Sequence, residues 1–235
     1  MGMIPKHAVL EYKSEYVWYK MRKQSSYHNS LFKKCFEVTF ALGAIFILAP
    51  VYLPICFLLK FMRGGPVFFK QKRVGKDGKV FTLIKFRTMR PGAEKELTGL
   101  KHLNEVDGPV FKIRDDPRLT KVGKFLAHTG LDELPQLINV VRGEMSLVGP
   151  RPLPVYEAEK LTRAQKIREL VKPGITSSWI TSGAHNLKFS RWMELDKKYL
   201  ERGSLTTDLS ILTQTIFLIL KSIVRRVKNE LKRTY

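Results

Sequence analysis

The sequence predicts an α+β protein that is attached to a membrane from one side, with a bent membrane helix, a small domain containing a β-hairpin, and amphipathic helices lying on the membrane surface. Three observations lead to this prediction. Residues 38–59 are uncharged, residues 64–89 have the pattern of two strands around a turn, and the C-terminal residues change from apolar to basic. We expect a polar, basic extension at 1–32, a re-entrant membrane helix at 33–63, a cytoplasmic domain at 64–205 and a basic interfacial helix at 206–235.

The composition narrows the class of partner. The chain has 235 residues and a formal net charge of +21, which favours an anionic partner such as a nucleic acid, an acidic membrane or a phosphorylated substrate. Its two cysteines, Cys35 and Cys56, have no spacing that suggests a disulfide framework or a zinc site. We therefore expect a reducing compartment.

The uncharged segment is VTFALGAIFILAPVYLPICFLL, from Val38 to Leu59. It is just long enough to cross a bilayer. Largely polar residues precede it, so we expect a retained anchor rather than a secretory signal. Its length and hydrophobicity argue against the alternative of a buried core helix.

Pro50 and Pro54 interrupt this segment, and each removes a helix hydrogen bond and clashes with the preceding turn. We predict a kink near Pro50. Basic residues flank both ends of the segment, whereas a simple spanning helix has them mainly on its cytoplasmic side. The charge pattern thus favours a re-entrant helix, which enters and leaves on one face, over a spanning helix.

The next segment, GGPVFFKQKRVGKDGKVFTLIKFRTM, predicts a β-hairpin whose turn lies at residues 76–79. The period of two in its second strand places four side chains on one face: Phe81, Leu83, Lys85 and Arg87. Lys85 and Arg87 would then hold one phosphate group together. The alternative is a basic face that lies against lipid headgroups. Residues 91–108 contain several loop formers and predict a loosely helical or mobile segment.

The segment VFKIRDDPRLTKVGKFL predicts a turn at Asp115–Arg118 followed by a short basic helix. After it comes LDELPQLINVVRGEMSLVGPRP, whose apolar spacing predicts a helix that begins near Asp132 and stops at Gly143. Asp132 would then be an ordinary N-cap, with Glu133 complementing the helix dipole.

The same geometry also suits phosphate chemistry, because helix N–H groups attract phosphate and keep a nearby carboxylate ionised. In this interpretation Asp132 attacks phosphorus and Glu133 holds a cation, most plausibly Mg²⁺, which offsets the negative charges. Pro150 and Pro152 stiffen the backbone around Arg151, which would bind phosphate or a nucleotide or simply cap a loop.

These motifs, in this order and followed by VKPGIT, resemble the bacterial sugar transferases, and in particular the small monotopic polyprenyl-phosphate phosphoglycosyl transferases. The resemblance extends from about residue 33 to the C-terminus. It implies a re-entrant helix and transfer of a sugar 1-phosphate from a nucleotide diphosphate sugar, usually a UDP-sugar, to undecaprenyl phosphate with Mg²⁺. It also implies a location on the cytoplasmic face of the bacterial inner membrane.

The resemblance also implies residue roles. Asp132 is expected to form an aspartyl-phosphosugar intermediate with release of UMP, and Glu133 to bind the metal or handle a proton. The candidate substrate-binding residues are Lys85, Arg87, Arg118, His128, Pro150, Arg151 and Pro152.

The chain departs from the family pattern at a few positions. Ala127 and Gly130 stand where members usually have arginine and often serine, and His128 is a partial substitute for that arginine. After VKPGIT, Trp179 is slightly displaced from the usual Gly-Trp position. These departures put the phosphate contacts and the donor in question.

The C-terminal region predicts a helix over 154–170 and then a helix whose apolar residues are ordinary core. The apolar run 209–220 is short for a membrane span and is followed by basic residues, which favours an interfacial helix on anionic lipid over a soluble packing helix. The predicted core residues are Met193, Leu195, Tyr199 and Leu200.

Three functional classes remain. The enzyme interpretation requires Asp132, Glu133 and the basic residues to converge near the membrane. A nucleic-acid-binding role has the charge but lacks a helix motif or an aromatic platform, so we expect no nucleic acid. A catalytically impaired membrane adaptor is the alternative. No motif identifies the sugar, and residues 1–30 are interpreted as either a surface helix or an element for homo-oligomerisation.

Overall fold

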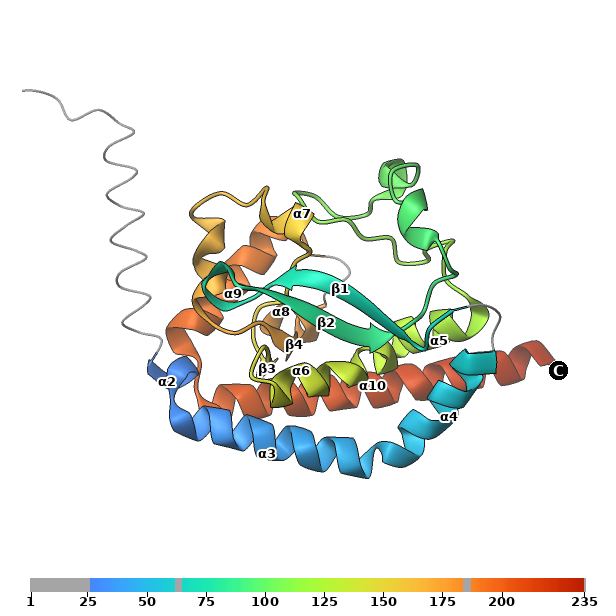
Figure 1. The fold of residues 1–235 in the computed structure, drawn as a ribbon, viewed down its shortest axis with the longest axis horizontal. Helices are drawn as coiled ribbons and strands as arrows, with labels where there is room; N and C mark the ends of the chain where they lie inside the picture. Colours follow the sequence, from blue (N-terminus) through green and yellow to red (C-terminus); the bar gives the residue numbers. More distant parts are fainter. Residues whose placement is uncertain (1–25, 62–64, 184–186, 235) are drawn as a thin grey trace, which may run out of the picture.

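The computed structural model describes residues 26–61, 65–183 and 187–234, with side chains as far as residue 228 (Figure 1). Helices and two small sheets form one mixed structure, so the α+β class is confirmed. Most of the expected N-terminal extension, including any surface helix within 1–25, lies outside the described residues.

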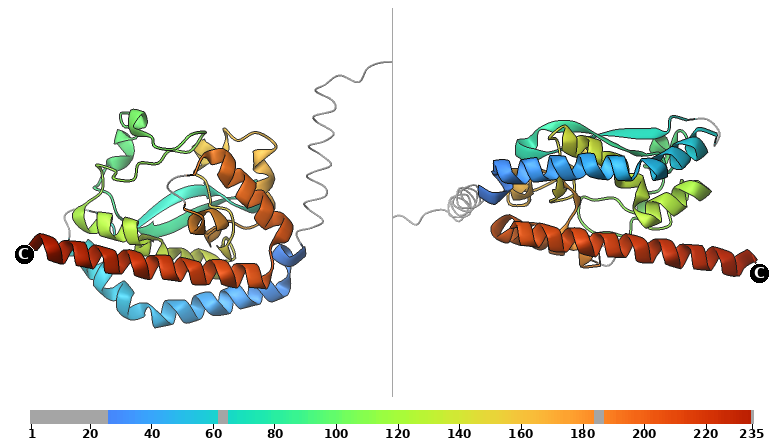
Figure 2. Two further views of the ribbon diagram at one scale, coloured as in Figure 1. Left: turned by 180° about the vertical axis from the view of Figure 1, so that it is seen from behind. Right: turned by 90° about the horizontal axis from the view of Figure 1, so that it is seen from below.

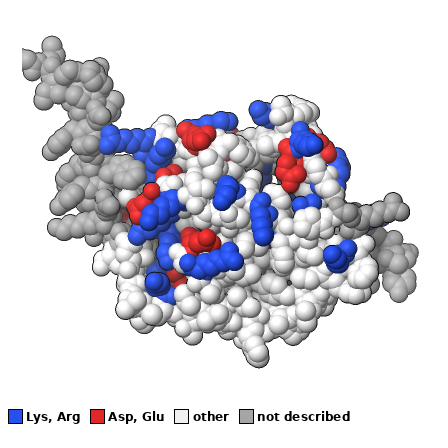
Figure 3. Space-filling view, viewed as in Figure 1, with Lys and Arg blue, Asp and Glu red and all other residues white. Residues whose placement is uncertain are grey.

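The uncharged segment forms two helices, α3 (Leu31–Ile47) and α4 (Ala49–Phe61), which meet at a bend of 63°. The break at Leu48 lies two residues before Pro50, so the predicted kink is confirmed. A bend of this size fits either a broken span or a re-entrant helix. Apolar side chains such as Phe46 and Ile47 are exposed, and Figure 3 shows an uncharged surface along the lower edge, where these helices lie.

A short helix, α2 (Ser26–Asn29), precedes α3, and the hydroxyl of Ser30 caps α3 by accepting a hydrogen bond from the amide of Lys33 at 3.2 Å. The apolar helix α3 therefore has a defined start. Its buried face contacts α6 (Leu137–Val141) and β3 (Ser146–Val148).

The predicted hairpin is confirmed: β1 (Phe68–Val74) and β2 (Val80–Phe86) are antiparallel, with Phe68 opposite Phe86 and Val74 opposite Val80. A 3₁₀ turn, η1 (Lys76–Gly78), joins them, and the positive φ angles of Asp77 and Gly78 suit Asp-Gly turn chemistry. Phe81 and Leu83 share a buried face as predicted, but Ile84 and Phe86 are buried too, so β2 is covered on both faces.

The strand β3 pairs in parallel with β4 (Gly174–Thr176), which brings the GPRP and KPGIT segments together. The two chains approach so closely that a Cβ atom on Gly174 would lie 2.1 Å from the amide nitrogen of Gly149. A hydrogen bond of 2.9 Å from the amide of Gly174 to the carbonyl of Pro150 also joins them. Glycine at this crossing therefore fixes the loop that carries Arg151.

The predicted helix over 154–170 is wrong, because the structure has two short pieces, α7 (Val155–Ala158) and η5 (Gln165–Leu170). Between them, the amide of Thr162 donates to the side chain of Gln165 at 2.8 Å, and the amide of Gln165 donates to the hydroxyl of Thr162 at 3.4 Å. This reciprocal capping starts a new helix. The segment 91–108 is loosely helical, as expected, with the 3₁₀ turns η2 (Ala93–Glu96) and η3 (Lys101–Leu103).

The C-terminal part begins with α8 (Ser178–Thr181) and α9 (Phe189–Arg202), on which Leu195, Tyr199 and Leu200 are buried as predicted. A single long helix, α10 (Leu205–Thr234), follows. Its part Leu205–Lys228 is long and apolar enough to cross a membrane by length and composition, so the helix extends beyond the apolar run 209–220 at both ends. The interfacial position of this helix stays a prediction. In Figure 2, α3 and α10 run in roughly the same direction along the lower side of the molecule.

Candidate active site

The two adjacent carboxylates lie on a 3₁₀ helix, η4 (Leu131–Gln136), that leads into α6. Gly130 ends the basic helix α5 (Lys121–Thr129) and begins η4, with a φ angle of +77°. The N-cap is therefore Gly130, and the interpretation of Asp132 as an N-cap is wrong. A positive φ angle favours glycine, which gives Gly130 a backbone role at this junction.

Asp132 is buried and faces β2, where the ammonium of Lys85 lies 4.0 Å from its Oδ2 atom. Burial raises the pKa of Asp132 above its ordinary range, whereas Lys85 acts to lower it. Burial also lowers the pKa of Lys85, and Asp132 opposes that shift. Each group thus partly opposes the pKa shift that burial causes in the other, and the net pKa of Asp132 is raised to about 7.

Glu133 forms an ion pair of 3.0 Å with Arg151, from the loop after β3. The main chain of this loop is held at Arg151 and at the next residue. The guanidinium of Arg73 donates to the carbonyl of Pro152 at 2.8 Å, and Arg168 donates to the carbonyl of Arg151 at 3.1 Å. The structure therefore brings Lys85, Asp132, Glu133 and Arg151 together; we call these four residues the site cluster.

Three further charged residues border the site cluster and were not predicted: Arg73, Lys112 and Glu157. Burial and the charge of Arg151 lower the pKa of Arg73 to about 10 and that of Lys112 to about 8. Glu157 is buried, which raises its pKa, and its Oε1 atom accepts a hydrogen bond from the amide of Phe111 at 3.2 Å. The position of Arg73 on a strand rich in basic residues is the one sequence signal that was available for them.

The chain resembles known proteins over most of its length. The sequence model of the family described as bacterial sugar transferase matches residues 28–222. The chain is a bacterial sugar transferase.

Three relatives give the range of similarity. The galactosyl transferase CpsE of Streptococcus agalactiae is 42% identical over 83% of this chain and 43% of its own length. The exopolysaccharide production protein ExoY of Sinorhizobium fredii is 38% identical over 78% of this chain and 83% of its own length. The UDP-glucose:undecaprenyl-phosphate glucose-1-phosphate transferase of Escherichia coli is 36% identical over 80% of this chain and 40% of its own length. The chain thus matches less than half the length of two of these relatives.

Other candidate binding residues of this sugar transferase contact groups outside the site cluster. Arg118 is buried in a two-point ion pair with Asp116, with distances of 2.9 and 2.6 Å. His128 bonds to the carbonyl of Arg114 at 2.9 Å and to the guanidinium of Arg226 on α10. A role of Arg118 or His128 in substrate binding stays a prediction.

Arg87 follows β2 directly, and its amide donates to the carbonyl of Val67 at 2.9 Å. Its Nε atom is buried and has no hydrogen-bond partner among the described residues. The hypothesis that Arg87 and Lys85 hold one phosphate together also stays a prediction.

The described residues contain no group of three or more His, Cys, Asp or Glu side chains that is suited to a metal ion. Asp132 and Glu133 are adjacent, however, and Mg²⁺ in phosphate chemistry is commonly bound by one or two carboxylates together with substrate phosphates. The donor set of this sugar transferase therefore fits Mg²⁺ when a diphosphate supplies the remaining oxygen ligands.

Proposed function

We propose that this chain transfers a sugar 1-phosphate from a UDP-sugar to undecaprenyl phosphate, as the first membrane step of exopolysaccharide, capsule, O-antigen or related glycoconjugate synthesis. The similarity to the UDP-glucose:undecaprenyl-phosphate glucose-1-phosphate transferase of E. coli supports the classes of donor, acceptor and transferred group. The observation that carries the proposal is the site cluster, in which a buried Asp132 faces Lys85 beside the Glu133–Arg151 pair. The sugar carried by the donor is a hexose or an N-acetylhexosamine.

The reaction has two displacements at one phosphorus atom. A carboxylate oxygen of Asp132 attacks the phosphorus that carries the sugar, and the bond to the bridging oxygen breaks, so that UMP leaves with that oxygen. A phosphate oxygen of undecaprenyl phosphate then attacks the same phosphorus. The bond to Asp132 breaks, which restores the carboxylate and yields the lipid diphosphate sugar.

The charges near Asp132 fit this chemistry. Lys85 opposes the rise in the pKa of Asp132 that burial causes, and Arg73, Lys112 and Arg151 offset the negative charge of the diphosphate. Glu133 and Asp132 would hold Mg²⁺, which supplies further charge neutralisation when it is bound. Arg151 is the group best suited to a two-point phosphate contact.

We further infer that α3 and α4 form a re-entrant helix and that α10 lies at the interface on the cytoplasmic side. The exposed apolar side chains of α3 and α4 and the basic residues flanking both ends support this orientation. The site cluster would then lie within reach of the phosphate of a membrane-embedded polyprenol.

The test is UMP release from a panel of UDP-sugars by the full chain in nanodiscs, with Mg²⁺ and undecaprenyl phosphate. We expect turnover with one donor and a loss of at least about a thousandfold in Asp132→Asn. Without acceptor, the wild type should release about one UMP per protein and retain the labelled sugar phosphate. Normal turnover by Asp132→Asn would overturn the covalent route, and a folded protein that is inactive with every donor would favour the adaptor alternative.

A further inference from the structure

A polar pocket lies at the base of the proposed membrane helix α3, away from the site cluster. It is bordered by α2, the start of α3, the hairpin turn η1 and the segment before β4, and it contains about 640 Å³ of empty space that is open to solvent. We call it the lysine pocket because four lysines line it, together with Glu37: Lys33, Lys34, Lys76 and Lys172.

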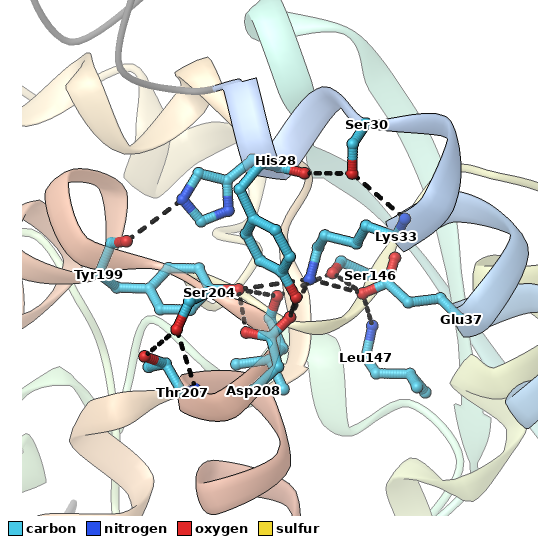
Figure 4. Close-up of polar contacts among 12 residues, drawn as sticks. His28, Ser30, Lys33, Glu37, Ser146, Leu147, Tyr199, Ser204, Thr207 and Asp208 are labelled. Atoms are coloured by element: carbon cyan, nitrogen blue, oxygen red, sulfur yellow. Dashed lines mark hydrogen bonds and ion pairs between the residues drawn. The ribbon is translucent and has the colours of Figure 1, made fainter.

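One wall of this pocket is a buried polar network (Figure 4). Lys33 is ion-paired with Glu37 at 2.9 Å and also with Asp208 on α10. The hydroxyl of Tyr199 donates to Asp208 at 2.7 Å, and Glu37 accepts hydrogen bonds from the hydroxyl of Ser146 and the amide of Leu147. We call Lys33, Glu37, Ser146, Tyr199 and Asp208 the helix-base network. Within it, the charge of Lys33 is fully compensated.

The other three lysines are not compensated in this way. Among the residues described by the structure, none forms an ion pair with Lys34, Lys76 or Lys172, although Lys76 donates a hydrogen bond to the side-chain oxygen of Asn29. Burial, together with repulsion from Lys34 and Lys76, lowers the pKa of Lys172, while Glu37 acts in the opposite direction. Like charges gathered in one pocket are stabilised when an anion binds between them.

The position of the pocket favours a lipid headgroup as that anion. Leu31 and Phe32, in the first turn of α3, are 73% and 61% exposed and lie next to Lys33 and Lys34 in the chain. This is the boundary between the apolar helix and the polar domain, where basic side chains meet anionic headgroups. The pocket is separate from the site cluster, because the hairpin turn is about 20 Å from Lys85 along β2 at the usual rise of a strand.

We propose that the lysine pocket binds the phosphate group of an anionic phospholipid headgroup through Lys34, Lys76 and Lys172. Such a lipid would hold the start of α3, the hairpin turn and the segment before β4 at one depth. The pocket would therefore set the height of the domain above the membrane without touching the reacting groups.

The test is native mass spectrometry of the full chain in detergent, titrated separately with short-chain phosphatidylglycerol, short-chain phosphatidylcholine and inorganic phosphate. The pocket variant is K34Q/K76Q/K172Q. The matched control is K95Q/K101Q/K160Q, which removes the same charge from exposed positions elsewhere. We expect saturable binding of phosphatidylglycerol to wild type and control, no saturation with phosphatidylcholine, and at least tenfold weaker binding to the pocket variant.

Equal binding of phosphatidylglycerol to the pocket variant and the control would overturn the proposal. Inorganic phosphate could also bind saturably and as tightly as phosphatidylglycerol, with this binding lost in the pocket variant. The pocket would then be a phosphate site, but the proposal that its ligand is a lipid would be overturned. If the triple variant does not fold, the exposed single substitution Lys34→Glu replaces it and should weaken binding several-fold. UMP release provides the check on folding, because none of these residues belongs to the site cluster.

Discussion

The site cluster and the helix-base network both contain a buried carboxylate near a lysine, yet the ion pairs in the two regions differ. In the helix-base network, Lys33 has two carboxylate partners, and Glu37 and Asp208 each accept further hydrogen bonds. In the site cluster, Lys85 lies 4.0 Å from Asp132, beyond hydrogen-bond distance, and only the Glu133–Arg151 pair is in close contact.

This difference separates a structural role from a chemical one. A buried charge that is fully hydrogen-bonded is costly to disrupt, because removing one partner leaves the other unpaired. A buried carboxylate without a close partner retains its affinity for an incoming phosphorus atom and metal ion. We therefore expect substitutions in the helix-base network to lower stability and substitutions in the site cluster to lower activity.

The largest effect on stability is expected for Lys33→Met. It leaves Glu37 and Asp208 buried without their cation, which should cost about 3–5 kcal/mol of unfolding free energy. Denaturant unfolding in detergent measures this loss, with Lys101→Met at an exposed site as the control. A loss no greater than that of the control would show that the network does not stabilise the fold.

Lys85→Met should reduce kcat/KM about a hundredfold with little change in unfolding. Lys85 lowers the pKa of Asp132, so its removal raises that pKa further. Because the reaction needs the ionised carboxylate, the acidic limb of the profile of kcat/KM against pH should move to higher pH. Lys85→Arg keeps the positive charge and should keep the limb near its original position. An unchanged limb in Lys85→Met would mean that Lys85 does not act on Asp132.

Arg151→Lys should raise KM for the donor about tenfold, because lysine cannot make the paired contacts of a guanidinium. The matched control is Arg142→Lys, the same substitution at an exposed arginine outside the site cluster. Steady-state kinetics with the preferred UDP-sugar measure the KM of each variant relative to that of the wild type. If both substitutions have equal effects, Arg151 has no specific role in donor binding.

The smallest effect is expected for Tyr199→Phe. It removes the hydroxyl that bonds Asp208 at 2.7 Å while Lys33 stays in place, so we expect a loss of about 1 kcal/mol in stability. UMP release should be unchanged. A large loss of activity without a loss of stability would place Tyr199 in the chemistry and break the distinction between the two regions.

Local chemistry explains which parts of the fold were predictable. The turn at Lys76–Gly78 and the bend near Pro50 depend on the conformational limits of Asp-Gly and proline, so neighbouring residues are enough to predict them. The pattern Thr162–Gln165 also carried a local capping signal, but the apolar spacing around it favoured one continuous helix. The pairing of β3 with β4 brings together segments far apart in the sequence, and no local pattern encodes it.

The candidate site was also predictable only where its residues are neighbours in the sequence. Asp132 and Glu133 are adjacent in the chain, so the sequence singled out the pair, but the resemblance to the family was needed to favour chemistry over helix capping. Lys112 and Arg73 come to the site cluster from other segments, and only tertiary packing brings them there. Arg118 has the residue type expected of a phosphate ligand, but its ion pair with Asp116 became visible only in the structure.

The contact between Lys33 and Asp208 also has a consequence for biosynthesis. The two residues are 175 positions apart. At the usual rate of bacterial or eukaryotic translation, roughly 9 to 35 seconds separate the addition of one from that of the other. Residues 31–61, which form α3 and α4, are therefore synthesised well before Asp208. Until Asp208 has been added, Glu37 is the one of these two carboxylate partners that is available to Lys33.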